Sequence, residues 1–204
     1  NWQLNELRKL GVPVLMETEV TPELVKKEKP DVIFAATGAI PIIPNIPGID
    51  RPNVVTAHDV LSGKVNTGSR VVVVGGGCVG AETANQLANY LKCVTIIEML
   101  DAIAGDEIVV PRWDLLEDLD RNKVRICTKT TVDEITDAGV KVSGAVNEVI
   151  PCDTVVLAVG AKPVLGLADA LKKEGYDVRV IGDAAKVGLG GEAIMEGFEV
   201  GRTI

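Results

Sequence analysis

The sequence predicts an α/β fold: a parallel sheet with helices and an antiparallel meander forms one unit, inserted into part of a second α/β domain. Four consecutive valines at 71–74 are typical of a strand that is buried on both faces, as parallel strands covered by helices are. A glycine-rich turn and an amphipathic helix follow this strand directly. Two similar segments, 31–41 and 153–163, bracket the unit and indicate where it is inserted.

The composition fits a globular protein with one large or two small domains. Of the 204 residues, 47% are hydrophobic and 3% aromatic, so aliphatic side chains are expected to fill the core. The net charge of −8 argues against nucleic acids and anionic membranes as partners. No apolar run reaches the roughly 18 residues that span a bilayer, and no signal-peptide pattern is present. The widely spaced cysteines suit reduced thiols, so we expect a cytoplasmic protein.

The elements before the glycines alternate between helix and strand. Residues 1–10 have the spacing of a helix that Gly11 ends, and residues 12–16 are apolar enough for a strand. Thr21 and Pro22 are typical of an N-cap and a first helical residue, so a short helix is expected after them.

A second strand and a stiff connector follow. Residues 31–36 predict a buried strand that ends at the turn Thr37-Gly38. Three prolines between residues 41 and 47 then indicate an extended connector that is neither a helix nor a central strand.

The glycines after the valine strand have the G-x-G-x-x-G spacing of a dinucleotide-binding, Rossmann-like fold. Gly75 permits the tight turn, Gly77 permits close approach of a pyrophosphate, and Gly80 permits close packing of the helix on the sheet. Cys78 and Val79 complete the first helical turn, where backbone N–H groups and the helix dipole favour an anion. The other interpretation is a glycine turn that serves packing alone.

An acidic residue ends the next strand, at residues 93–98. Glu98 lies 18 residues after Gly80 (98 − 80), where a carboxylate accepts hydrogen bonds from the adenosine ribose. No arginine stands at position 99 or 100 to receive a 2′-phosphate, so the sequence favours NAD over NADP.

The rest of the inserted unit is predicted to be a helix from Pro111 to Leu119 and an antiparallel meander. The four segments of this meander are 124–126, 131–135, 140–142 and 149–150. Beyond it, a helix is expected at 165–174, a strand at 176–181 and a last helix after the glycine-rich loop 188–191. That loop either aims the dipole of the last helix at a ligand or is merely mobile.

The segments 31–41 and 153–163 share Asp, Ala, Gly, Ala and Pro at identical offsets. Each predicts a buried strand, a glycine turn and an exit through proline. We expect residues 53–159 to form the inserted domain, and residues 1–52 and 160–204 to form the second domain.

The ordered motifs P-D-V-I-F-A-A-T-G-A-I-P, T-A-H-D-V-L, V-V-V-V-G-G-G-C-V-G-A-E-T-A and V-I-G-D-A give the chain a family resemblance. It resembles the C-terminal region of NADH:flavin oxidoreductases of the old-yellow-enzyme type that carry extra FAD and NAD domains. Enoate reductase, 2,4-dienoyl-CoA reductase and trimethylamine dehydrogenase belong to that group.

The resemblance implies two cofactors for this chain. NAD(H) is implied at Gly75, Gly77, Cys78, Val79, Gly80 and Glu98, with Glu82 near the nicotinamide. FAD is implied at Thr37, Gly38, Gly160, Gly182 and Asp183. The fingerprint that holds the ADP half of FAD is expected upstream of residue 1, as is a barrel that carries FMN and an iron–sulfur cluster. The chain is therefore expected to be a fragment with a partial FAD-binding domain.

The implied function is to position NADH for hydride transfer to FAD and onward electron transfer. Because that chemistry belongs to the cofactors, the chain itself is expected to contain no catalytic acid or base. The single histidine, His58, is expected to be a packing residue, and no metal site is predicted. One alternative is a reductase of the pyridine nucleotide–disulfide type, which needs a reactive cysteine pair. The other is a non-enzymatic NAD(H)-binding module.

Overall fold

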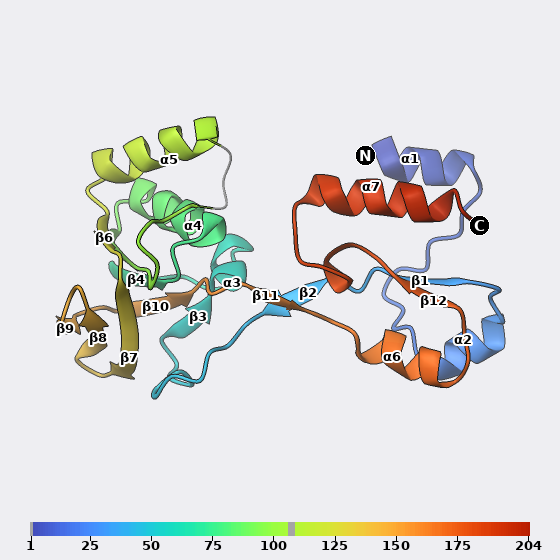
Figure 1. Cartoon of the computed structure of the whole chain (residues 1–204), viewed down its shortest axis with the longest axis horizontal. Helices are drawn as coiled ribbons and strands as arrows, with labels where there is room; N and C mark the ends of the chain where they lie inside the picture. The colour runs from blue at the N-terminus through green and yellow to red at the C-terminus, as the bar shows by residue number, and fades with distance from the viewer. Residues whose placement is uncertain (1, 106–108) are drawn as a thin grey trace. The chain divides into compact units, whose positions relative to one another are not determined.

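The computed structural model describes residues 2–105 and 109–204, so Asn1, which the first predicted helix included, lies outside the described residues. The chain divides into two compact units. Unit 1 contains Asn1–Gly38 and Pro163–Ile204, and unit 2 contains Ala39–Lys162 (Figure 1). In sequence, unit 2 therefore interrupts unit 1.

Unit 2 is built on a parallel sheet. In spatial order its described strands are β3 (Val54–Thr56), β10 (Thr154–Leu157), β4 (Arg70–Val74), β5 (Cys93–Ile97) and β6 (Arg125–Cys127). Every neighbouring pair is parallel, with Val73 of β4 opposite Ile96 of β5 and Val156 of β10. Residues 71–74 are all buried, as expected for a central parallel strand with both faces covered.

Two layers cover the two faces of this sheet (Figure 1). The first contains α3 (Ala57–Leu61), α4 (Cys78–Asn89) and α5 (Val109–Arg121), which pack through an aliphatic cluster that includes Leu87, Ile96 and Leu119. The second is an antiparallel sheet of β7 (Thr130–Thr136), β8 (Gly139–Gly144) and β9 (Glu148–Ile150). A second aliphatic cluster, with Val72, Ile135 and Val140, joins this sheet to the parallel one.

The strand predicted at residues 124–126 is present, but its assignment to the antiparallel meander was wrong. This segment was expected in the antiparallel meander, but it forms the edge strand β6 of the parallel sheet, with Ile126 opposite Ile96. The helix α5 lies between β5 and β6 in the chain, and such a crossover is what brings a following strand back parallel.

An ion pair joins β4 and β10 at the end of the sheet where β4 begins. The Arg70 guanidinium donates to the Asp153 carboxylate, with an Nη2–Oδ1 distance of 2.6 Å. The hydrogen bond from the Arg70 side chain, together with that from its backbone N–H, holds the pKa of Asp153 down to about 2. This end of the sheet lies opposite the glycine-rich turn, which follows the last residue of β4.

The proline-rich connector packs onto unit 2. Ile46 and Ile49 contact the aliphatic cluster between the two sheets, and the Ile135 N–H donates to the Pro47 carbonyl oxygen at 2.8 Å. The structural division therefore falls after residues 38 and 162, whereas the sequence placed the boundaries after 52 and 159. Before the connector, β2 (Ala39–Pro41) pairs with β11 (Ala161–Pro163) in a separate two-stranded sheet.

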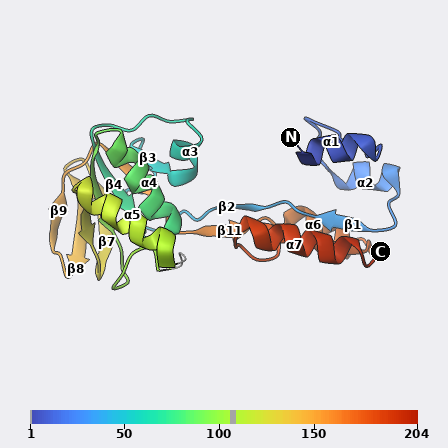
Figure 2. The ribbon, with the colours of Figure 1, turned by 90° about the horizontal axis from the view of Figure 1, so that it is seen from above.

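Unit 1 has its own small core. Its described elements are α1 (Trp2–Lys9), α2 (Pro22–Glu28), β1 (Ile33–Ala35), α6 (Gly166–Lys173), β12 (Val178–Val180), the 3₁₀ turn η1 (Gly182–Ala184) and α7 (Gly190–Gly201). Figure 2 labels the four helices and β1. The strands β1 and β12 pair in parallel, and Ala35, Leu171 and Val178 belong to one buried cluster. As predicted, Thr21 caps α2: its Oγ1 accepts a hydrogen bond from the Leu24 N–H at 3.3 Å.

The strand predicted at residues 12–16 is absent from the described structure. Val12, Val14, Leu15 and Met16 are exposed, and no described strand pairs with them. An apolar run becomes a strand only where a neighbouring strand satisfies its backbone groups.

None of the helices in the described parts of the chain is long and apolar enough to cross a bilayer.

Candidate functional site

The site is built around the turn Gly75–Gly77, called here the glycine turn, which joins β4 to α4. Gly75 has a φ of +99°, which L side chains rarely adopt. A Cβ at this position would lie 2.4 Å from the Ala158 carbonyl oxygen, at the end of β10. Only glycine fits, because both the backbone conformation and the neighbouring strand exclude a side chain.

Gly80 has the packing role that the sequence predicted. A Cβ on it would lie 2.0 Å from the Gly75 carbonyl oxygen, so the first turn of α4 contacts the glycine turn through backbone atoms. Gly77 is the N-cap of α4 and has no side chain with which to cap the first-turn N–H groups. Cys78 is half-buried, whereas Val79 is exposed. The start of α4 thus has the geometry of an anion site: a helix N-terminus reached over glycine.

Glu98 follows β5 and is buried, with 8% of its surface exposed. One oxygen, Oε2, accepts a hydrogen bond from the Gly76 N–H at 2.6 Å, and the other, Oε1, accepts from the Leu100 N–H at 2.8 Å. The carboxylate therefore braces the glycine turn. Because an ionised carboxylate offers about four lone-pair sites, acceptor capacity remains for ligand hydroxyls.

The loop after β5, residues 98–105, lies against the glycine turn, and sequence reasoning missed this contact. The Ala104 N–H donates to the Gly76 carbonyl oxygen at 2.7 Å. A Cβ at Gly76 would lie 2.6 Å from Cγ2 of Ile103 and 3.1 Å from Cβ of Glu98. The available signal was the middle glycine of G-G-G: the spacing assigns no role to Gly76, yet the structure leaves it no room for a side chain.

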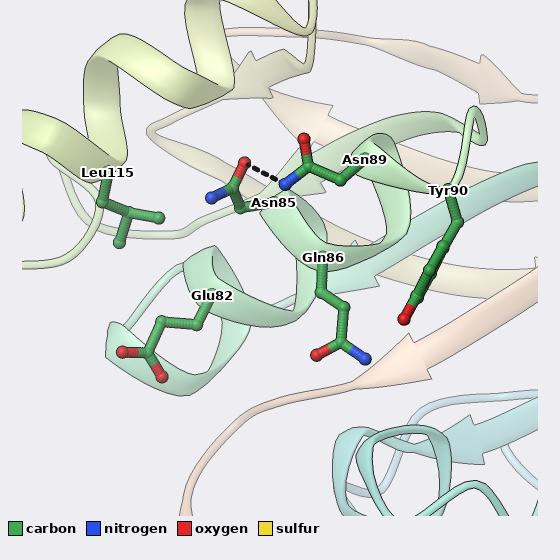
Figure 3. A pocket seen from close by; sticks show the side chains of 6 residues that line it. All are labelled: Glu82, Asn85, Gln86, Asn89, Tyr90 and Leu115. Atoms are coloured by element: carbon green, nitrogen blue, oxygen red, sulfur yellow. Dashed lines mark hydrogen bonds between the residues drawn. The ribbon is translucent and has the colours of Figure 1, made fainter.

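Glu82 lies in a different place, on the outer face of α4. It lines an open depression of about 500 Å³ together with Asn85, Gln86, Asn89, Tyr90 and Leu115 (Figure 3). The Asn89 side-chain amide donates to the Asn85 oxygen at 3.5 Å. The described lining contains Glu82 but none of the glycines of the turn, so this depression is separate from the glycine turn.

Unit 1 gathers four of the remaining predicted residues at one edge of its sheet. Thr37 and Gly38 follow β1, and Gly182 and Asp183 follow β12, so parallel pairing places both pairs at the carboxyl ends of adjacent strands. The Ile181 N–H donates to the Ala35 carbonyl oxygen at 3.1 Å and extends this pairing toward the turn.

A depression of about 260 Å³ opens beside this edge. Its lining consists of Gly182, Asp183, Lys186, Gly188, Leu189, Glu192, Ala193 and Glu196. The Gly182 N–H donates to Oε2 of Glu196 at 2.6 Å, and the Gly188 N–H donates to Oδ1 of Asp183 at 3.2 Å. Three carboxylates and one lysine thus surround the depression, which suits ligand hydroxyl groups better than phosphate.

Gly160 belongs to unit 2, so the structure does not group it with Asp183. It has a φ of +93°, and its carbonyl oxygen accepts a hydrogen bond from the Ile42 N–H at 3.0 Å. At the other end of the same two strands, the Val164 N–H donates to the Gly38 carbonyl oxygen at 3.0 Å. The two similar sequence segments therefore lead into β2 and β11, which pair with each other.

Cys93, Cys127 and Cys152 are free thiols. Burial raises the pKa of the Cys127 and Cys152 thiols, which lowers their thiolate fraction. Within residues 2–105 and 109–204, no group of three or more His, Cys, Asp or Glu side chains is arranged to hold a metal ion.

Comparison with known proteins gives a consistent picture. A family described as "Pyridine nucleotide-disulphide oxidoreductase" matches residues 14–181. An NADH oxidase of Thermoanaerobacter brockii is 39% identical over 98% of this chain and 32% of its own length. A bilirubin reductase of Mediterraneibacter gnavus is 39% identical over 88% of this chain and 28% of its own length.

A solved structure covers the whole chain. The complex of 2-naphthoyl-CoA reductase with 2-naphthoyl-CoA has a TM-score of 0.92 and 34% identity, over 100% of this chain and 31% of that one. The chain thus spans about a third of the length of the relatives that it matches.

Proposed function

Because this chain belongs to the pyridine nucleotide-disulphide oxidoreductase family, we propose that unit 2 binds NADH for hydride transfer to an FAD bound by unit 1. The family consists of flavin-dependent oxidoreductases that bind FAD and NAD(P). Bound NADH supplies the hydride and FAD accepts it, while the chain's own residues bind and orient the two groups. The observation that carries the proposal is the glycine turn braced by Glu98, at the N-terminus of α4.

The N-terminus of α4 and the Glu98 carboxylate suit different parts of the dinucleotide. The N-terminus of α4, at Gly77, favours the pyrophosphate through its N–H groups and the helix dipole. The Glu98 carboxylate, at the end of β5, accepts hydrogen bonds from the adenosine ribose hydroxyls. Its negative charge repels a 2′-phosphate, which supports NADH over NADPH.

In unit 1, Thr37, Gly38, Gly182 and Asp183 are proposed to contact FAD. The carboxylate-rich depression beside Asp183 supports binding of the ribityl hydroxyls there. The Thr37 hydroxyl donates a hydrogen bond to the Val164 carbonyl oxygen at 2.5 Å, and this bond fixes the turn after β1. Gly160 is proposed to affect FAD through the β2–β11 sheet.

The parent enzyme is proposed to be of the old-yellow-enzyme type, in which an N-terminal barrel carries FMN and an iron–sulfur cluster. The roughly threefold greater length of the relatives supports further domains. The apolar side chains that α1 and α7 expose, among them Trp2, Leu4, Ile194 and Phe198, support a covering by such domains. The net charge of −8 makes nucleic acids and anionic membranes poor partners. Alone, the chain is not expected to complete turnover.

The test is a paired titration of the chain with NADH and NADPH, followed by nicotinamide fluorescence. Wild type is expected to bind NADH at least about tenfold more tightly than NADPH, because the Glu98 charge faces the 2′-position. Glu98→Gln is expected to weaken the binding of NADH about tenfold and to reduce the ratio of NADH affinity to NADPH affinity. Glu117→Gln, an exposed acid on α5, is the control that changes net charge by the same amount.

Two outcomes decide against this function. Equal affinity for NADH and NADPH, unchanged in Glu98→Gln, contradicts the role of Glu98. Absence of NADH binding contradicts the assignment of unit 2.

Adding FAD separates the alternatives: tight NADH binding without loss of flavin absorbance favours a non-enzymatic module. The raised pKa values of Cys127 and Cys152 speak against these two thiols as the reactive pair of a thiol-based reductase.

A further inference from the structure

Arg112 on α5 makes a set of hydrogen bonds that the proposed function does not use. Its Nε donates to the Ala104 carbonyl oxygen at 2.9 Å, and its Nη2 donates to the Ile103 carbonyl oxygen at 3.0 Å. The planar guanidinium thus binds two consecutive backbone carbonyls of the loop 98–105. Ile103 and Ala104 are buried, with 4% and 0% of their surfaces exposed. Their carbonyls therefore depend on protein donors.

Ala104 is also in a strained conformation. Its φ is +49°, in the left-handed region that non-glycine residues rarely adopt. Such a conformation persists only where the surroundings impose it, and strained residues gather at functional sites. Here the constraints are on both sides: Arg112 binds the Ala104 carbonyl, and the Gly76 carbonyl binds the Ala104 N–H at 2.7 Å.

These contacts form a continuous path from α5 to the glycine turn. Arg112 fixes Ala104, Ala104 fixes the carbonyl of Gly76, and Glu98 fixes the N–H of the same glycine. The Ile103 side chain closes the remaining space over Gly76. The glycine turn, whose backbone faces the dinucleotide in the proposed function, is thus held from the side of the loop on both of its peptide groups.

We propose that Arg112 is a positioning residue for the dinucleotide: through Ala104 it holds the loop 98–105 against the glycine turn in the binding-competent geometry. It touches no part of the ligand and acts by preorganisation, so its removal lowers affinity without removing a ligand contact. This inference rests on the proposed function, because the ligand concerned is NADH.

The experiment measures NADH affinity of the full chain by nicotinamide fluorescence, and amide exchange at Ala104 by NMR. Arg112→Ala is expected to weaken the binding of NADH about tenfold. This is the size of effect that the loss of one strong hydrogen bond has. Methylguanidinium added at millimolar concentration is expected to restore most of the loss, and Arg112→Lys is expected to be intermediate. Amide exchange at Ala104 is expected to become about tenfold faster. Without Arg112 the loop opens more often, and the hydrogen bond from the Ala104 N–H to the Gly76 carbonyl oxygen breaks with it.

Arg121→Ala is the matched control. Arg121 lies on the same helix, but its guanidinium pairs with Glu117 and Asp118 at the surface, so NADH affinity and Ala104 exchange are expected to stay at the wild-type values. Wild-type NADH affinity in Arg112→Ala overturns the inference. So does an equal loss in both variants that methylguanidinium does not restore, because that result indicates general destabilisation. If the wild-type chain itself binds no NADH, the proposed function fails, and the Ala104 exchange still reports whether Arg112 holds the loop.

Discussion

Three glycines within six residues are needed for three different physical reasons. Gly75 supplies a positive φ, Gly76 leaves space for Ile103, and Gly80 allows α4 to touch the backbone of the turn. The sequence spacing alone identified the first and third of these roles, because they follow from the general geometry of a strand, turn and helix. The role of Gly76 depends on a loop more than 20 residues later, which no local pattern reveals.

Gly80→Ala is expected to destabilise unit 2 by about 3 kcal/mol, because its Cβ would lie 2.0 Å from a backbone oxygen that cannot move away freely. The measurement is denaturant unfolding followed by the fluorescence of Trp113, which lies on α5 in unit 2, in a Trp2→Phe background. Gly197→Ala is the control: Gly197 lies within α7 of unit 1 in open space, so alanine is expected to leave the Trp113 transition of unit 2 unchanged. Equal behaviour of the two variants contradicts the packing role of Gly80.

At the scale of elements, β4, α4 and β5 could be predicted closely because their evidence is local: a buried apolar run, a glycine turn and a 3.6-residue period. The strand at 124–126 was correctly expected, but its sheet was not, since partner choice depends on the chain path through α5. The strand predicted at 12–16 failed because apolar character does not supply a pairing partner. Arg112 escaped prediction for a similar reason: its partners are backbone carbonyls, which leave no trace in residue types.

The antiparallel sheet of β7, β8 and β9 offers a test of the second aliphatic cluster. Val140 on β8 has no exposed surface, whereas Val149 on β9 is 44% exposed. Val140→Ala is expected to lower the free energy of unfolding by about 2 kcal/mol, because two methyl groups are lost and a cavity remains. Val149→Ala is expected to change it by less than about 0.5 kcal/mol. Circular dichroism during urea unfolding measures both, and similar losses would contradict the assigned core.

At the scale of the whole molecule, the two units have separate cores. The aliphatic clusters on the two faces of the parallel sheet consist of residues from unit 2 alone, and the cluster around Leu171 consists of residues from unit 1 alone. A unit with its own core can fold by itself. Unit 2 is also one uninterrupted segment of the chain, whereas unit 1 is assembled from two.

Residues 39–162, produced as a separate protein, are therefore expected to fold and to bind NADH as the full chain does. Trp113 is the only tryptophan of this segment, so its fluorescence follows unfolding directly. A cooperative transition at the same denaturant midpoint as in the full chain is expected, since the core is unchanged. A non-cooperative transition, or loss of NADH binding that the full chain shows, would mean that unit 2 needs unit 1.

The pairing of β2 with β11 has a consequence for how this architecture can arise. The Ile42 N–H lies 3.0 Å from the Gly160 carbonyl oxygen, so the segment between them begins and ends at neighbouring points. A genetic event that inserts or deletes such a segment leaves the host chain with two strand ends that a tight turn can join. The inserted segment can therefore be gained or lost as one piece while the fold of the domain that receives it stays the same.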